Sequence, residues 1–177
     1  MSDILFRHED YVFSYRVAGI LIRDNKVLLQ KSNNDTAYAF PGGHVAFGET
    51  TAETLIREFK EEAGADIKVC SLKWVEENFF PWGDKPCHQI SLTHLVALLN
   101  VEQSPLEGRF ISNEYSKSDE NAIYFYWIPL DDVKNINVYP AKAAKLLLHL
   151  DDGLQHFIYR GWSDASHPAR PSNPEGE

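Results

Sequence analysis

Long apolar stretches are missing from this sequence. No run approaches the roughly 18 to 20 apolar residues that a membrane-spanning helix requires. The first ten residues, MSDILFRHED, also lack the apolar core of a secretory signal peptide. We therefore expect a protein that has no membrane partner and resides in the cytoplasm.

Cysteine is scarce as well. Cys70 and Cys87 are the two cysteines in 177 residues, and they do not have the spacing of a zinc finger. A reducing compartment would keep them as thiols, so we interpret both as packing residues. His88 and His94 share a strand face and have no Cys or His partner at zinc spacing, so they are not expected to bind a metal.

Positive charge is in the minority, with 17 Lys and Arg against 26 Asp and Glu and a formal net charge of -9. This balance opposes binding to the backbone of DNA or RNA, which needs clustered cations, so bulk nucleic acid is not an expected partner. A small phosphorylated substrate requires metal ions or a few placed cations to offset the repulsion between carboxylates and phosphates. The composition therefore points to a metal site.

The sequence does contain enough apolar material for one globular core, with 44% hydrophobic and 24% charged residues. Its length fits one domain, which we place at residues 1–162. Three prolines and polar residues follow, so residues 163–177 are expected to form a disordered tail.

Strand signals are interrupted by two convincing helix signals. We expect a hairpin over 13–30 with its turn at Asp24-Asn25, a short extended piece at 38–40, a helix over 51–63, strands over 67–80 and 88–101 joined by a substantial loop, a loop over 102–121, a strand over 122–128, a helix from Pro140 to Gly153 and an edge strand over 154–160. This order predicts an α/β fold, an α/β/α sandwich with a mixed β-sheet.

The helix over 51–63 has well-marked ends and two distinct faces. Thr50 and Glu53 have capping-box spacing, and Gly64 can supply a left-handed stop. At 100° per residue, the apolar and acidic side chains fall in adjacent sectors; the apolar set is Ala52, Leu55, Ile56, Phe59 and Ala63, and the acidic set is Glu58, Glu61 and Glu62. One face is expected to pack and its neighbour to be acidic.

Carboxylates at this spacing repel each other and destabilise a helix. Mg²⁺ or Mn²⁺ would offset the repulsion, because hard cations prefer oxygen ligands. The alternative is a solvated face on which Arg57, Lys60 and Glu61 form exposed charge pairs.

A longer pattern decides between these readings. Seven residues recur at the spacing G-x5-E-x7-R-E-U-x-E-E-x-G-U, where U is apolar: Gly43, Glu49, Arg57, Glu58, Glu61, Glu62 and Gly64, with Phe59 and Ala65 at the apolar positions. The segment from Gly43 to Ala65 resembles the signature of the Nudix hydrolase family, whose members include MutT-like proteins. The order of the flanking strands is similar to that family's sandwich.

The resemblance implies roles for these residues. Glu58, Glu61 and Glu62, with the carbonyl of Gly43, would hold Mg²⁺ or Mn²⁺. Arg57 would hold Glu58 in position. Glu49 would steady the turn into the helix, or is an ordinary first-turn acid stabilised by the helix dipole.

The reaction implied is attack of water on a phosphorus of a nucleoside diphosphate derivative, such as ADP-ribose, a nucleotide sugar or a nucleoside triphosphate. Glu58 or Glu62 could be the general base. The later-loop acid that serves in some relatives would be Glu120, with Asp119 and Glu114 as further candidates. The alternative function is a sensing or regulatory domain that binds a nucleotide without turnover.

Substrate contacts are expected from the loops. Gly42, Gly43 and His44 would lie at the phosphates, unless His44 is simply a solvated loop histidine. Trp82 could stack on a base or cover a sugar, and packing is the alternative for this residue. Phe79 and Phe80 are expected in the core, and Pro81, sixteen residues beyond the signature, resembles a marker of ADP-ribose-cleaving relatives. The N-terminal segment and the long apolar strands could also pair between subunits in a homodimer.

Overall fold

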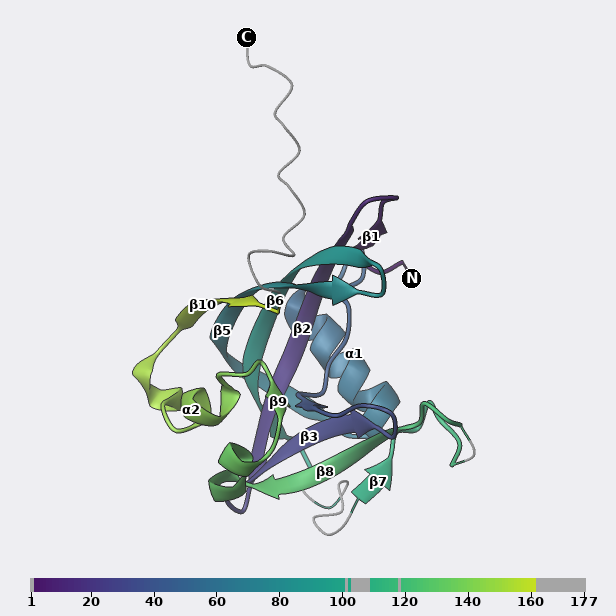
Figure 1. Ribbon diagram of the computed structural model, residues 1–177. Helices are drawn as coiled ribbons and strands as arrows, with labels where there is room; N and C mark the ends of the chain where they lie inside the picture. The colour runs from purple at the N-terminus through teal and green to yellow at the C-terminus, as the bar shows by residue number, and fades with distance from the viewer. Residues whose placement is uncertain (1, 101, 103–108, 118, 162–177) are drawn as a thin grey trace.

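The computed structural model describes residues 2–100, 102, 109–117 and 119–161. Ten strands among these residues form one mixed sheet with the order β10-β5-β6-β2-β3-β4-β9, while β1 pairs with β2 and the β7–β8 pair attaches to β3 (Figure 1). The strands are β1 (Leu5–Arg7), β2 (Val12–Arg23), β3 (Lys26–Ser32), β4 (Tyr38–Ala39), β5 (Ile67–Trp82), β6 (Lys85–Leu98), β7 (Arg109–Ile111), β8 (Ile123–Pro129), β9 (Val138–Tyr139) and β10 (Gln155–Arg160).

The sheet is mixed because β2–β6, β4–β9 and β5–β10 are parallel pairs and the other pairs are antiparallel. The expected hairpin at the start of the chain is confirmed. Asp24 and Asn25 have φ angles of 50° and 59°, the left-handed pair that a tight two-residue hairpin turn requires.

Strands β2 and β3 separate soon after this turn. Their ladder contains two residue pairs, Ile22 with Val27 and Arg23 with Lys26, after which β2 runs beside β6 and β3 runs beside β8. The space between them is filled by the segment 41–45, whose backbone is hydrogen-bonded to β2 from Tyr15 to Gly19. The divergence of two neighbouring strands thus places Gly42 and Gly43 against the middle of β2.

Both faces of the sheet are covered. On one face lies α1 (Thr51–Ala63), and its Leu55 and Phe59 are buried against β2, β3, β6 and β8. The other face carries the 3-10 helices η2 (Leu130–Asn135) and η3 (Leu150–Asp152), the short helix α2 (Ala143–Leu147) and β9, which enclose a second core around Trp74 and Phe40. The expected α/β/α sandwich with a mixed sheet is confirmed.

The expected loop between the two long strands is wrong. Strand β5 continues to Trp82, and β6 begins at Lys85, so only Gly83 and Asp84 make the turn. Pro81 pairs opposite Pro86, at the end of the hairpin beyond the last residue pairs with β10 and β2. The missing proline N–H groups therefore interrupt no neighbouring ladder.

Other boundaries also differ from expectation. The helix expected from Pro140 to Gly153 is reduced to α2 and η3, and the acids Asp151 and Asp152 would oppose the helix dipole at the C-terminal end of a longer helix. The loop expected over 102–121 contains β7. The expected disordered tail, 163–177, lies outside the described residues.

Several side chains lie elsewhere than predicted. Cys87 is buried, but Cys70 is exposed. Ile56, expected on the packing face of α1, is 44% exposed. Phe79 and Phe80 are half-buried rather than in the core, because the hairpin end on which they lie extends to the rim of a pocket. In the part of the chain that the structure describes, no helix is long and apolar enough to span a membrane.

Candidate metal centre and adjoining pocket

Two glycines bring the loop before α1 close to its neighbours. Gly42 has a φ of 147°, and a Cβ there would lie 2.2 Å from the carbonyl oxygen of Val17. A Cβ on Gly43 would lie 2.3 Å from the carboxylate of Glu58. The backbone at both positions therefore approaches β2 and α1 more closely than a side chain permits.

Helix α1 begins and ends where its sequence predicts. The Glu53 N–H donates to the Thr50 hydroxyl at 3.2 Å, and the Thr50 N–H donates to the Glu53 carboxylate at 2.8 Å, which completes the capping box. Gly64 has a φ of 65° and closes the C-terminus. These caps fix the start and the end of the helix that carries the acidic side chains.

Arg57 holds three carboxylates at once. Its Nε and Nη2 donate to the two oxygens of Glu49 at 2.9 and 3.1 Å. Its Nη1 donates to Glu58 at 2.8 Å and to Glu61 at 3.0 Å. Glu49 also accepts a hydrogen bond from the Thr54 hydroxyl at 2.8 Å, so its carboxylate is committed to this network, which links the loop to α1.

The acidic face of α1 opens into a cleft of about 570 Å³. Glu58, Glu61 and Glu62 all line it, together with Gly42, Gly43 and His44 from the loop. Glu62 is 7% exposed, and its Oε2 has no hydrogen-bond partner among the described residues. Burial, followed by the charge of Glu58, raises the pKa of Glu62 to about 8. The ionised form of this carboxylate therefore requires a nearby cation.

This set of donors fits a hard divalent cation. It offers carboxylate oxygens, one of them buried without a partner, beside a glycine backbone that leaves no side chain in the way. The glutamate oxygens are not drawn into one tight group, since the described residues contain one trio of potential ligands within 4.8 Å, and it lies elsewhere. A wider spacing suits ions that complete their coordination with water and phosphate oxygens.

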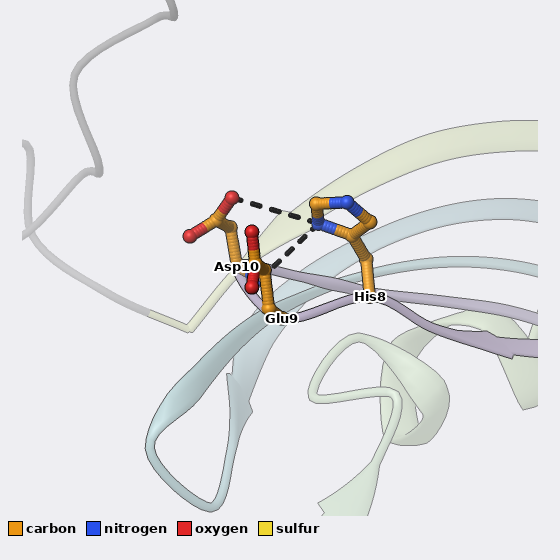
Figure 2. Close-up of side chains that lie close together, drawn as sticks. All are labelled: His8, Glu9 and Asp10. Carbon is orange, nitrogen blue, oxygen red and sulfur yellow. Dashed lines mark hydrogen bonds and ion pairs between the residues drawn. The ribbon is translucent and has the colours of Figure 1, made fainter.

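That trio, His8, Glu9 and Asp10, forms the turn between β1 and β2 (Figure 2). All three residues are exposed, and the His8 Nδ1 accepts a hydrogen bond from the Asp10 N–H at 3.2 Å. The grouping follows from adjacency in a turn and the local hydrogen bond. It gives no independent indication of a metal.

The later-loop acids are arranged differently from expectation. Glu120 is exposed and does not line the cleft, while its carbonyl accepts a hydrogen bond from the Asn34 side chain at 3.2 Å. The carboxylate of Asp119 accepts hydrogen bonds from the N–H and the hydroxyl of Ser116. Glu114 lines the cleft, and its charge contributes to the raised pKa of Glu58 and Glu62. The turn that starts β8 keeps Asp119 and Glu120 out of the cleft wall, so Glu114 is the one of these three acids that lines the cleft.

A second pocket, of about 690 Å³, adjoins the cleft on the face of the sheet away from α1. The two cavities share four lining residues: Arg16, Asp35, Ala37 and Ala39. Part of the pocket wall is aromatic and is formed by Phe80, Trp82, Tyr139 and Tyr159. Its floor is polar and comes from alternate residues of β2, β5 and β6: Arg16, Glu76, Asn78, Gln89, Ser91 and Thr93.

His44 and Trp82 lie on either side of the boundary between the cavities. His44 lines the cleft and Trp82 lines the pocket, and their ring centroids are 6.1 Å apart. Burial, aided by the charge of Arg16, lowers the pKa of His44. The structure thus brings all the expected contact residues to two adjoining cavities: Gly42, Gly43 and His44 line the cleft and Trp82 lines the pocket.

The polar floor was not predicted from the sequence, although a signal for it exists. Glu76 and Asn78 on β5, and Gln89, Ser91 and Thr93 on β6, place polar side chains at every second position of their strands, although Glu77 makes the alternation on β5 incomplete. Such a period of two on neighbouring strands indicates a shared polar face. Recognising it required the register of β5 against β6.

Comparisons with known proteins find relatives of this chain in sequence and in structure. A model of the NUDIX domain matches residues 14–150. An ADP-ribose pyrophosphatase of Methanocaldococcus jannaschii is 40% identical over 89 residues, which cover 49% of this chain and 52% of that protein. An RNA pyrophosphohydrolase of Ruthia magnifica subsp. Calyptogena magnifica is 29% identical over 131 residues, covering 65% of this chain and 70% of that protein.

The match to the Methanocaldococcus protein thus spans about half of that protein's length. The match to the putative ADP-ribose pyrophosphatase YjhB of Bacillus subtilis spans 25% of the length of YjhB. Among solved structures, a UDP-X diphosphatase superposes with a TM-score of 0.58 at 17% identity, covering 86% of this chain and 69% of that one. This last likeness is one of fold.

Proposed function

Because the chain belongs to the NUDIX domain family, we propose that it is a metal-dependent hydrolase that cleaves the diphosphate linkage of a nucleoside diphosphate derivative. One observation carries the proposal: Glu58, Glu61 and Glu62 line a single cleft beside Gly43. A solvated acidic face, the alternative interpretation of these residues, would not bury Glu62 to 7% exposure.

Glu58, Glu61 and Glu62 are the residues that would hold Mg²⁺ or Mn²⁺. The carbonyl of Gly43 accepts a hydrogen bond from the Val17 N–H at 2.9 Å, and its second lone pair is available to a cation. When bound, the ion polarises phosphoryl oxygens and lowers the pKa of a bound water. Arg57 orients Glu58 and Glu61 through hydrogen bonds of 2.8 and 3.0 Å and has no need to contact the substrate.

Glu114 is our candidate for the carboxylate that accepts the proton of the attacking water. It lines the cleft but is not on α1, so it can act as a base while the three glutamates of α1 serve as ligands. Glu58 and Glu62 would have to serve as ligand and base together.

The substrate class follows from the relatives and the pocket. The Methanocaldococcus relative is named for ADP-ribose, and the UDP-X diphosphatase for UDP-linked compounds. A pocket of about 690 Å³ with aromatic and polar walls beside the cleft is large enough for the group attached to the diphosphate. ADP-ribose and nucleotide sugars are therefore the first compounds to test, before nucleoside triphosphates.

The test is a panel of ADP-ribose, UDP-glucose and nucleoside triphosphates, assayed with Mg²⁺ and with Mn²⁺ and with identification of the products. We expect release of a mononucleotide or phosphate that stops on addition of EDTA. Glu62→Gln should lower kcat by a factor on the order of one hundred or more, because it removes an anionic ligand from the cleft.

Glu9→Gln is the matched control, since it makes the same chemical change in the exposed turn between β1 and β2. It should retain full activity. Tight nucleotide binding without product across the panel would instead support a sensing domain, and equal loss in both variants would place the chemistry outside the cleft.

A further inference from the structure

Arg16 lies where the two cavities meet. Its side chain lines both the cleft and the second pocket, and the backbone of Arg16 bridges to His44 in the loop beside the cleft. Among the described residues, it is the one basic side chain that lines the second pocket. Anything that extends from the cleft into that pocket therefore passes this guanidinium.

Most donors of this guanidinium are uncommitted. Its Nη2 donates to the carbonyl of Gly42 at 2.9 Å, and no carboxylate of the described residues forms an ion pair with it within 4.0 Å. A guanidinium has five N–H donors in a planar, forked arrangement. The hydrogen bond to Gly42 therefore leaves donors free that could bind two oxygens of one anion. That hydrogen bond also fixes where the fork lies.

The other Lys and Arg side chains that line the cleft, Lys31 and Arg57, do not line the second pocket. Arg57 is bonded to Glu49, Glu58 and Glu61. Lys31 lies over the Tyr38 ring, with its Nζ 4.8 Å from the centroid. Arg16 is therefore the basic group best placed to meet an anion that enters between the cavities.

The charges around Arg16 favour a ligand anion once a cation is bound. Burial lowers the pKa of Arg16, while the charges of Glu62, Glu58 and Glu76 raise it, and the guanidinium stays protonated. A divalent cation on the glutamates of α1 would neutralise most of that negative charge. The half-buried guanidinium would then lack compensation, and a phosphate, whose oxygens match its fork, would supply it.

We propose that Arg16 binds the diphosphate of the substrate at the junction of the two cavities, so that the organic group attached to it lies in the second pocket. This inference rests on the proposed hydrolase function and adds a binding residue and an orientation to it. The bond to be cleaved would lie between Arg16 and the glutamates of α1. The hydrogen bond to the carbonyl of Gly42 would keep the guanidinium in place.

The pocket also indicates what the attached group is like. A hydrogen-bonded chain runs along its floor, in which the Thr93 hydroxyl donates to Glu76 at 2.6 Å and the Asn78 amide donates to Glu76 at 3.3 Å and to Gln89 at 3.4 Å. Glu76 accepts from both neighbours, so the floor presents a carboxylate as a fixed acceptor. Phe80 and Trp82, whose rings stack on each other, also line the pocket, which therefore suits a group with hydroxyl or amino donors and a face that can stack.

Binding measured with Ca²⁺, a hard cation that the same carboxylates can hold, tests Arg16 apart from turnover with Mg²⁺ or Mn²⁺. ADP-ribose, ADP and adenosine would be titrated against wild type, Arg16→Met and Arg16→Lys, with product analysis to confirm that the nucleotides stay intact. We expect Arg16→Met to lower the affinity for ADP-ribose and for ADP by about tenfold or more, since both carry phosphate. The affinity for adenosine, which carries none, should change by no more than about twofold. Arg16→Lys should lie between, because it keeps the charge and loses the fork. In turnover assays, KM should rise more than kcat falls.

Arg23→Met is the matched control. It removes the same side chain from the other end of β2, where Arg23 pairs with Asp24 and lines neither cavity, and it should leave all three affinities unchanged. If Arg16 were a counter-ion for the glutamates and nothing more, Arg16→Met would tighten Mg²⁺ binding and leave the affinity for ADP unchanged, which would overturn the proposal.

Failure of the hydrolase proposal is a different result: wild type would bind ADP through Arg16 yet hydrolyse none of the panel. Should Arg16→Met not fold, the Arg16 Nε–H signal in wild-type NMR spectra supplies the answer. That signal should shift on addition of ADP and not on addition of adenosine, and an equal response to both would contradict the proposal.

Discussion

At the scale of single residues, the structure distinguishes between two candidates for the general base, Glu114 and Glu120. Glu114 lines the cleft, whereas Glu120, six positions further along the chain, is exposed and does not line it. Sequence position alone favoured Glu120, because it lies nearest to the strand that follows. The two residues form a natural pair for mutagenesis.

We predict that Glu114→Gln lowers kcat by about 10²-fold or more with little change in KM, because general base catalysis typically contributes about 10² to 10⁴. Glu120→Gln should behave as wild type. Steady-state kinetics with the best compound of the panel measures both. If Glu120→Gln is the slower variant, the loop rearranges in the complex and the assignment to Glu114 is wrong.

At the scale of elements, the function depends on how α1 begins. Its first turn is held by reciprocal bonds between Thr50 and Glu53, and Glu49 just before it is held by Arg57 and Thr54. These contacts fix the start of α1 and thereby the positions of its glutamates. The cap is therefore a structural requirement of the proposed metal site.

Thr50→Ala should lower the free energy of unfolding by about 1 kcal/mol, the usual cost of losing an N-cap side chain. The melting temperature should fall by about 2 to 4 °C in a domain of this size. Thr51→Ala makes the same change one residue later, where no capping bond is lost, and should leave the melting temperature equal or slightly higher. Equal losses in the two variants would show that the cap is not what matters.

At the scale of the whole molecule, clustered acids make the stability of the metal-free protein depend on pH. The pKa of Glu62 is raised to about 8 by burial and by Glu58. For an acid whose pKa is higher in the folded state, the protonated form is favoured by folding. The stabilisation is present below the unfolded pKa, near 4.5, and is lost as the pH rises through the folded value.

In EDTA, we therefore predict that wild type loses stability from about pH 5 to pH 8, with a slope of up to about 1.4 kcal/mol per pH unit from Glu62. Glu62→Gln should reduce this slope, whereas Glu61→Gln, with a side chain 49% exposed, should retain it. Urea denaturation at several pH values measures the effect. Mg²⁺ should restore stability at pH 8 in wild type, and identical slopes in all three proteins would contradict the raised pKa.

Much of this protein could be read from its sequence because the decisive signals are local. The turn at Asp24-Asn25, the cap at Thr50 and Glu53 and the stop at Gly64 each depend on residues within a few positions, and all three are present in the structure. The acidic stripe of α1 follows from helix periodicity in the same way. Local chemistry therefore determined the helix, the layered fold and the family.

Tertiary structure decided the rest, because the remaining features join residues far apart in the chain. The continuation of β5 to Trp82 depends on its pairing with β6, and the choice of Glu114 over Glu120 depends on how the turn before β8 lies against Asn34. Arg16 resembles any strand residue until the divergence of β2 and β3 admits the loop of Gly42 beside it. The sequence by itself determined the acidic helix and the family, while the three-dimensional arrangement of the strands determined that Arg16 and the second pocket adjoin the cleft.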